Sequence, residues 1–293
     1  CYMGNTFINN TSYQGPLKEN TQLGAELIGD STVDADAEIL AMAADCLHRA
    51  GLREFQLSVG HAEFFRGLSE AAGLDEEQEE ELRELISNKN YFGVSEFAET
   101  LNLKEDLNNL FQMLGNLYIG SDELQKAKEY AAAYPRIQNA ISRLEELHQV
   151  LKLYEIEKYV SFELGIVSNY QYYTGIIFAG YTFGSGEPVI KGGRYDELLT
   201  YFGKNSASIG FAVVIDQLMA ALSRQKIEIP LVNQTLLLVY EPAQRQNAIT
   251  QARRFREQGH YTELIVRDVR KGKAEYQAYA KRNHIAEIRF LND

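Results

Sequence analysis

A long helical pattern that interrupts strand-like sequence is the feature that most limits how this chain can fold. Residues 62 to 152 are acidic, rich in Leu, Glu and Ala, and almost free of Pro and of clusters of β-branched residues. Apolar residues recur at intervals of three and four, as on the buried face of an amphipathic helix. These positions are Leu107, Leu110, Phe111 and Leu114, and then Ile137, Ile141, Leu144 and Leu147. We therefore expect a block of packed helices, in which the acidic run from Asp75 to Leu82 is a solvated helix start.

Alternating apolar and polar residues predict strands on both sides of this block. Tyr2 to Gly29 reads as two strands joined by a polar loop, and Phe55 to Val59 reads as a third strand. After the block, residues 159 to 183 alternate again and predict antiparallel strands. The glycines of the Gly184 to Gly186 segment favour a hairpin turn over a phosphate-binding loop, because no helix start follows at the spacing that phosphate loops require.

Helices are expected between and after these strands. Asp34 or Asp36 is expected to cap the first helix, because a side-chain oxygen can accept hydrogen bonds from the free amides of the first turn, and Gly51 is expected to end it. The later elements are a strand through Val189 and Ile190 to Gly193, a helix over 196–201, a strand over 208–212 and a helix over 215–222.

Pro230 marks a boundary, after which strand and helix patterns alternate regularly. Strands are expected at 236–240, 263–266 and 286–290, with helices at 242–258 and 274–282. Alternation of this kind favours a parallel sheet with right-handed crossovers. The last part of the chain is therefore predicted to be a small βαβαβ module.

Charge argues against a general affinity for nucleic acid. The net charge is −12. Residues 231 to 293 hold 11 Lys or Arg against 7 Asp or Glu, a net +4, which leaves −16 for residues 1 to 230. An acidic body loses the phosphate contacts that supply most non-specific affinity, so only the C-terminal module keeps that option open.

The remaining composition favours a cytoplasmic protein without a metal site. No run approaches the roughly 20 apolar residues that cross a bilayer, and the N-terminus lacks a signal-peptide pattern. Cys1 and Cys46 lie far apart and form no CxxC pair, as is usual in a reducing compartment. The five histidines show no metal-ligand spacing, and His61 is interpreted as structural.

Five segments carry the functional information through their order. They are QLGAELIGD at Gln22–Asp30, DAEIL at Asp36–Leu40, YYTGIIF at Tyr172–Phe178, GGRYDELL at Gly192–Leu199 and SIGFAVVIDQL at Ser208–Leu218. Together they resemble the histidyl-tRNA synthetase family over nearly the whole chain. The resemblance implies an α+β fold with a class II aminoacyl-tRNA synthetase-like antiparallel sheet flanked by helices. Residues 1–61 and 153–228 would form this core, 62–152 a helical insertion, and 229–293 a small C-terminal α/β module.

The resemblance also implies a histidine-binding pocket. It assigns Gln22 to the amino and carboxyl end of histidine, Glu26 to one imidazole nitrogen and Tyr173 to the other, with Tyr172 and Tyr195 in the same pocket. Neutral imidazole has one donor and one acceptor, so a carboxylate and a hydroxyl can select it. Gln22 and Glu26 lie an even number of positions apart, which places both on one face of a strand. The alternative is a remnant surface that binds no ligand.

The family's catalytic arginines are replaced in this sequence. Aligned to the family, the Phe-Arg pair that clamps the α-phosphate becomes Phe7 and Ile8, and a second motif 2 arginine becomes Thr11. The arginine before the tyrosine motif becomes Ser168. In the last motif, Asp216 and Gln217 replace a Glu-Arg pair. Adenylation brings two anions together, and arginine supplies the fixed bidentate donors for this step. We therefore expect no catalytic residues and no synthetase activity.

Among relatives without these arginines, the chain resembles the regulatory subunits of ATP phosphoribosyltransferase. This implies a partnership with the short catalytic subunit in the first step of histidine biosynthesis, L-histidine as effector, self-association as a dimer, and no cofactor. A divergent histidyl-tRNA synthetase and a tRNA-binding, stress-sensing module are the two alternatives. Because the first residue is Cys1 rather than Met, we also expect a preceding segment that carries motif 1.

Overall fold

The computed structural model describes residues 1–7, 19–116, 119–167, 172–229 and 235–291. Their contacts form two compact units, Cys1–Glu228 and Ile229–Asp293. Four positions used in the sequence comparison, Ile8, Thr11, Ser168 and Pro230, lie outside the described residues.

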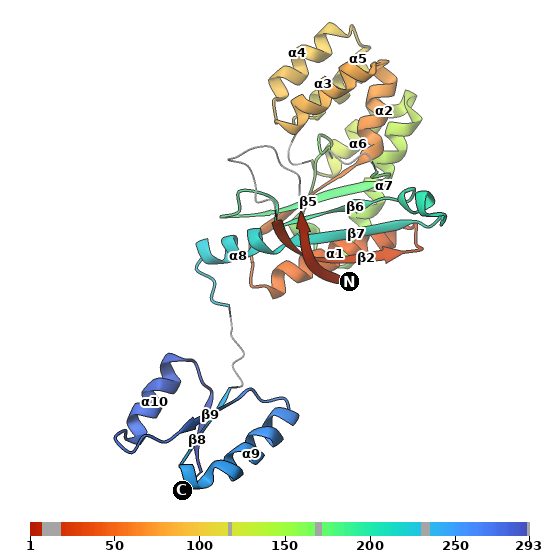
Figure 1. Cartoon of the computed structure of the whole chain (residues 1–293). Helices are drawn as coiled ribbons and strands as arrows, with labels where there is room; N and C mark the ends of the chain where they lie inside the picture. Colours follow the sequence, from red (N-terminus) through yellow and green to blue (C-terminus); the bar gives the residue numbers. More distant parts are fainter. Residues whose placement is uncertain (8–18, 117–118, 168–171, 230–234, 292–293) are drawn as a thin grey trace. The chain divides into compact units, whose positions relative to one another are not determined.

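A seven-stranded sheet forms the centre of the first unit (Figure 1), in the order β1-β2-β7-β6-β5-β3-β4. The strands are β1 (Tyr2–Phe7), β2 (Glu19–Ile28), β3 (Phe55–His61), β4 (Val160–Phe162), β5 (Ile176–Thr182), β6 (Ile190–Arg194) and β7 (Ser208–Val214). All neighbours pair antiparallel except β3 and β4. The expectation of antiparallel strands over 159–183 is therefore wrong for β4. A parallel pair needs a long crossover, and the helices between β3 and β4 provide one.

Helices flank this sheet and fill the segment between β3 and β4. They are α1 (Val33–Arg49), α2 (Ala62–Ala72), α3 (Glu76–Ser87), α4 (Tyr91–Thr100), α5 (Glu105–Met113), α6 (Ser121–Tyr130), α7 (Pro135–Leu153) and α8 (Ile215–Arg224). The apolar positions predicted from helical spacing are all buried. Asp75 caps α3 in a capping box, as its acidic start predicts. The helix expected over 196–201 is instead a short 3-10 helix, Leu198–Phe202, that ends at Gly203 with φ 77°.

One hydrophobic core joins the sheet to these helices. On β2 and β7, Ala25, Ile209 and Val213 belong to the same buried cluster as the apolar face of α1. α7 contacts α1, α2 and β3, so it connects the helical block to the sheet. Side chains alternate between the two faces of a strand. The residues between those core positions therefore face the opposite, open side of the sheet.

The expected aspartate cap of α1 is wrong. The N-cap is Thr32, which makes no capping hydrogen bond, and Asp30 Oδ1 accepts from the Thr32 amide at 2.8 Å. Asp36 is fully buried and accepts from Arg194 Nε at 2.7 Å and from Arg143 Nε at 2.8 Å. Two guanidinium groups from distant parts of the chain therefore bind the carboxylate that the local sequence predicted to cap the helix.

His61 ends β3 and caps α2, as its structural interpretation predicts. Its Nδ1 accepts from the Glu63 amide at 3.2 Å, which requires an unprotonated nitrogen. Burial lowers the pKa of His61 to about 4, whereas an unfolded histidine titrates near 6.5. The unfolded state therefore binds more protons between these values, so stability rises with pH across the window from about 4 to 6.5.

We expect the His61→Asn variant to show a weaker loss of stability on acidification than the wild type. Asparagine keeps an N-cap acceptor and removes the titrating ring. Lowering the pH from 7 to 5 should reduce the wild-type free energy of unfolding through His61 by about 1 to 2 kcal/mol. Urea unfolding of both proteins at the two pH values measures the difference. Equal pH dependence in the two proteins would contradict a neutral His61 in the folded state.

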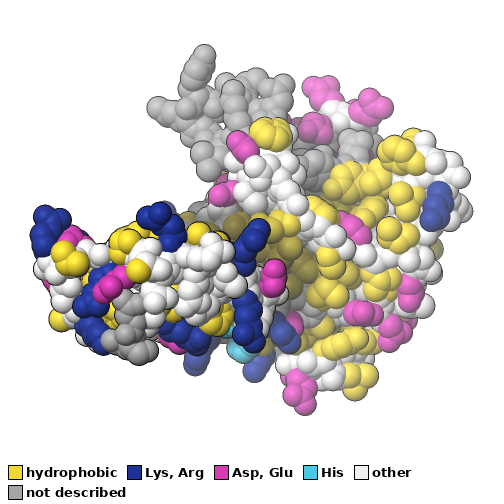
Figure 2. Space-filling view, turned by 60° about the horizontal axis from the view of Figure 1, so that its bottom comes forward, with side chains coloured by type: hydrophobic (Ala, Val, Ile, Leu, Met, Phe, Trp, Pro, Cys, Tyr) yellow, Lys and Arg dark blue, Asp and Glu magenta, His cyan; other side chains and the backbone are white. Residues whose placement is uncertain are grey.

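The second unit is a three-stranded parallel sheet in the order β10-β8-β9, as the alternating pattern predicts. Its elements are β8 (Leu236–Tyr240), a 3-10 turn (Pro242–Gln244), α9 (Arg245–Glu257), β9 (Thr262–Val266), α10 (Lys273–Arg282) and β10 (Glu287–Phe290). Leu236 and Leu238 pack against α9, while Leu237 and Val239 pack against Tyr276 of α10. Lys and Arg side chains are numerous on the surface of this unit (Figure 2).

None of the helices in the described ranges of the chain is long and apolar enough to cross a membrane. Both cysteines are free thiols, Cys1 being exposed and Cys46 half-buried.

Candidate functional site

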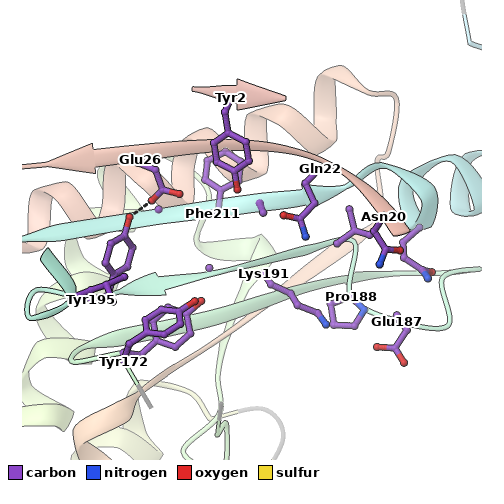
Figure 3. A pocket seen from close by; sticks show the side chains of 17 residues that line it. Tyr2, Asn20, Gln22, Glu26, Tyr172, Glu187, Pro188, Lys191, Tyr195 and Phe211 are labelled. Atoms are coloured by element: carbon purple, nitrogen blue, oxygen red, sulfur yellow. Dashed lines mark hydrogen bonds between the residues drawn. The ribbon is translucent and has the colours of Figure 1, made fainter. Parts of the chain in front are cut away.

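A pocket of about 440 Å³ opens over strands β2, β7 and β6 on the face of the sheet opposite α1 (Figure 3). This volume lies within the range of small-molecule sites, roughly 300 to 1,000 Å³. The five residues predicted from sequence to bind histidine all line it. They are Gln22, Glu26, Tyr172, Tyr173 and Tyr195.

Residues with small side chains form the floor of the pocket. Gly192, Gly210 and Ala212 line it. On the neighbouring strands, Gly24 pairs with Ala212 and Gly193 pairs with Gly210. A Cβ atom on Gly210 would lie 1.7 Å from Glu26 Oε2, and one on Gly193 would lie 2.6 Å from the Tyr173 ring. The glycines therefore give the carboxylate and the phenol room to lie flat against the sheet.

The Gly210→Ala variant is expected to lose roughly 1 to 3 kcal/mol of folding free energy, because its methyl group overlaps both the Glu26 carboxylate and the Ala25 carbonyl oxygen, 2.7 Å away. Gly186→Ala is the matched control, since a Cβ there meets nothing within 4 Å. Urea unfolding of the two variants gives the comparison. Equal stability of the two variants would show that the pocket floor accommodates the added methyl group.

Glu26 and Tyr195 form a polar pair at one end of the pocket. The Tyr195 hydroxyl donates to Glu26 Oε2 (Figure 3). Burial raises the pKa of Tyr195, and its hydrogen bond to Glu26 raises it further. Tyr195 therefore remains a protonated donor at neutral pH and orients the carboxylate. Glu26 Oε1 is left to accept a hydrogen bond from a ligand.

Three more tyrosines surround this pair. Tyr172 stacks obliquely on Tyr173, with ring centroids 4.6 Å apart, and meets Tyr195 edge-on at 6.0 Å. Tyr2 of β1 lies opposite Gly24 in register, and its ring occupies the space above that glycine. Burial and the nearby Glu26 charge raise the pKa of Tyr2. A flat, apolar ligand with polar edges fits this surrounding.

The buried residue next to Tyr195 fixes its position. Arg194 is 4% exposed and binds Asp36, the Asp30 carbonyl oxygen at 2.9 Å and Asp196 Oδ1 at 3.0 Å. Asp196 in turn donates its amide to Thr174 Oγ1 at 2.9 Å. The GGRYD and YYTG segments are thereby held together, which brings Tyr173 and Tyr195 to one pocket.

Several pocket residues were not singled out as ligand-binding by the sequence. Tyr2, Asn20, Glu187 and Lys191 line the pocket, and Gln217 lines it in place of the expected arginine. Alternation predicts that Lys191 shares a strand face with Gly193, two positions later, but only the pairing of β6 with β5 and β7 brings that face to the pocket. Tyr2 depends on the pairing of β1 with β2, which no local pattern reveals.

Asp216, at the other altered position of the last motif, accepts from the Thr21 amide at 3.0 Å. It therefore supports the start of β2 and does not line the pocket. Among the described parts of the chain, no group of three or more His, Cys, Asp or Glu is arranged to hold a metal ion.

The antiparallel sheet, its flanking helices and the pocket on its open face define a class II aminoacyl-tRNA synthetase-like protein. The family model for histidyl-tRNA synthetase matches residues 1–218. Histidyl-tRNA synthetase from Nostoc has the same fold, with a TM-score of 0.74 at 17% identity over 97% of this chain and 68% of that one.

More similar sequences identify the branch of this class. The ATP phosphoribosyltransferase regulatory subunit of Acetivibrio thermocellus is 38% identical over 90% of this chain and 63% of its own length. That of Ruminiclostridium cellulolyticum is 36% identical over 100% of this chain and 69% of its own length. A Bacillus halodurans structure described as an ATP phosphoribosyltransferase regulatory subunit/histidyl-tRNA synthetase gives a TM-score of 0.76 at 32% identity, over 99% of this chain and 72% of that one.

The chain belongs to the ATP phosphoribosyltransferase regulatory subunit family. The resemblance inferred from the order of the sequence motifs is confirmed, as is the α+β class II synthetase-like fold. The chain spans about two thirds of the length of these curated relatives.

Proposed function

We propose that this protein is a non-catalytic regulatory subunit that binds L-histidine in the pocket of Gln22, Glu26 and the tyrosines. Bound histidine would change its contacts with the short catalytic subunit of ATP phosphoribosyltransferase and so inhibit the first step of histidine biosynthesis. The observation that carries the proposal is the Glu26–Tyr195 pair in a pocket lined by aromatic rings.

The Glu26–Tyr195 pair can select the imidazole ring of histidine. Glu26 Oε1 can accept from one imidazole N–H, while the hydroxyl of Tyr173 can donate to the second nitrogen. Most other amino-acid side chains lack a donor and an acceptor on one small ring. They would leave at least one of these polar groups unpaired, which costs affinity.

The protein is also proposed to lack synthetase activity, because it lacks the arginines that adenylation needs. By the resemblance to the synthetases, Ile8, Thr11, Ser168 and Gln217 occupy positions where those enzymes carry arginine. Loss of one preorganised donor commonly raises a reaction barrier by roughly 2.7 to 4 kcal/mol. Feedback then requires that histidine bind two states of the complex with different affinity. We further propose that the protein is cytoplasmic and self-associates as a dimer.

Titration calorimetry and activity measurements test the two halves of this function separately. We expect the protein to bind L-histidine, alone or with the short catalytic subunit, and to make the phosphoribosyltransferase rate sensitive to histidine. Absence of histidine binding in both settings rejects the sensing role. If the protein neither associates with the catalytic subunit nor changes its rate, the regulatory role is rejected.

A divergent histidyl-tRNA synthetase is the second candidate, favoured by the family model over residues 1–218. Histidine-dependent exchange of pyrophosphate into ATP by the purified protein would support it. Salt-sensitive tRNA binding would instead favour a tRNA-binding module, for which the basic surface of the Ile229–Asp293 unit is the candidate.

A further inference from the structure

The pocket has two ends of different chemistry (Figure 3). Glu26, Tyr195 and Tyr2 lie toward one end, where the ring-selecting pair is found. Lys191 and Glu187 lie toward the other. Lys191 is the one cationic side chain among the described residues that line the pocket.

The sheet register fixes the separation of the two ends. Glu26 pairs with Gly210, which pairs with Gly193. Lys191 is two positions before Gly193 on β6, so its row is displaced from the Glu26 row by about 6.6 Å along the strands. This displacement is comparable to the distance between the ring and the carboxylate of one histidine molecule. Lys191 and Gly193 also share a strand face, and Gly193 faces the Tyr173 ring.

Lys191 is available to bind a ligand. Its side chain is exposed, and among the described residues it has no side-chain hydrogen bond or ion pair. An ammonium on a flexible four-carbon chain can reach an anion without a fixed approach. Glu187 lies three residues after Gly184 in the β5–β6 turn and brings the opposite charge to the same end. Together they offer both partners that a zwitterion needs.

We propose that Lys191 binds the α-carboxylate of the ligand and Glu187 its α-ammonium group, so that the pocket selects a complete free amino acid. This inference rests on the proposed histidine pocket and deepens it. It makes Lys191 and Glu187 specificity-determining residues. Imidazole compounds that lack one of the two charges can still bind the Glu26 end, but they lose the matching interaction at the other.

Three ligands separate the two interactions in a calorimetric titration of the intact protein. L-histidine carries both charged groups, histamine lacks the carboxylate, and imidazole-4-propionate lacks the ammonium. Lys191→Met should weaken the binding of L-histidine and of imidazole-4-propionate by about tenfold or more and leave the affinity for histamine unchanged. Glu187→Gln should weaken the binding of L-histidine and of histamine and leave the affinity for imidazole-4-propionate unchanged. Lys191→Arg keeps the charge and should retain most of the affinity.

Lys126→Met is the matched control, because it removes the same charge from an exposed position on α6. It should leave all three affinities unchanged. If wild-type protein binds neither L-histidine nor histamine, the histidine pocket itself is rejected, and this inference with it. If wild-type protein binds L-histidine but Lys191→Met weakens all three ligands equally or none of them, the carboxylate assignment alone is overturned.

Discussion

The Arg194→Ala variant should lower the free energy of unfolding of the Cys1–Glu228 unit by about 3 to 5 kcal/mol, because it leaves a buried carboxylate with half of its compensation. Asp36 is fully buried, and its two oxygens divide between Arg194 and Arg143. Arg194 also binds the carbonyl oxygens of Asp30 and Thr32, at 2.9 and 3.3 Å. Its removal therefore loosens the start of α1 as well as β6.

Urea unfolding followed by circular dichroism measures this effect. Arg49→Ala is a suitable control, because it breaks an Arg49–Asp45 ion pair whose side chains are 81% and 58% exposed; such surface pairs contribute at most about 1 kcal/mol. The double variant Arg194→Met with Asp36→Leu removes both charges and should recover part of the loss. A single variant as stable as the control would show that the buried network does not hold the two elements together.

The Glu26→Gln variant should weaken L-histidine binding by about 30- to 100-fold, equivalent to roughly 2 to 3 kcal/mol. Glutamine keeps the size of the side chain but replaces a charged acceptor with a neutral amide, part of which donates. The proposed imidazole N–H then faces a weaker or mismatched partner. Among the described residues that line the pocket, the other carboxylate is Glu187, which lies at the opposite end and so cannot substitute for Glu26.

Calorimetry at neutral pH tests this expectation. Glu84→Gln removes the same charge from an exposed position on α3 and should bind histidine like the wild type. Tyr195→Phe removes only the donor that orients Glu26, so we expect a smaller loss, about tenfold. If Glu26→Gln binds histidine with wild-type affinity, the tyrosines rather than Glu26 read the ring.

Periodicity predicted most of the secondary structure because burial imposes it locally. The helices between β3 and β4, the parallel order of β8, β9 and β10, and the shared face of Gln22 and Glu26 all follow from patterns of a few residues. Errors arose where distant residues compete for a group. Asp36 reads as a helix cap in the sequence, but two buried arginines remote in sequence bind it more strongly than the free amides of one turn.

The order of the motifs by itself determined the family, the α+β fold and five of the residues that line the pocket. Only the tertiary structure decided how that pocket is completed. Tyr2 enters it through the pairing of β1 with β2, and Lys191 and Glu187 enter through the β5–β6 hairpin. Strand pairing joins residues far apart in the chain, and side-chain direction depends on register. The charges at the far end of the pocket are therefore a property of the folded sheet.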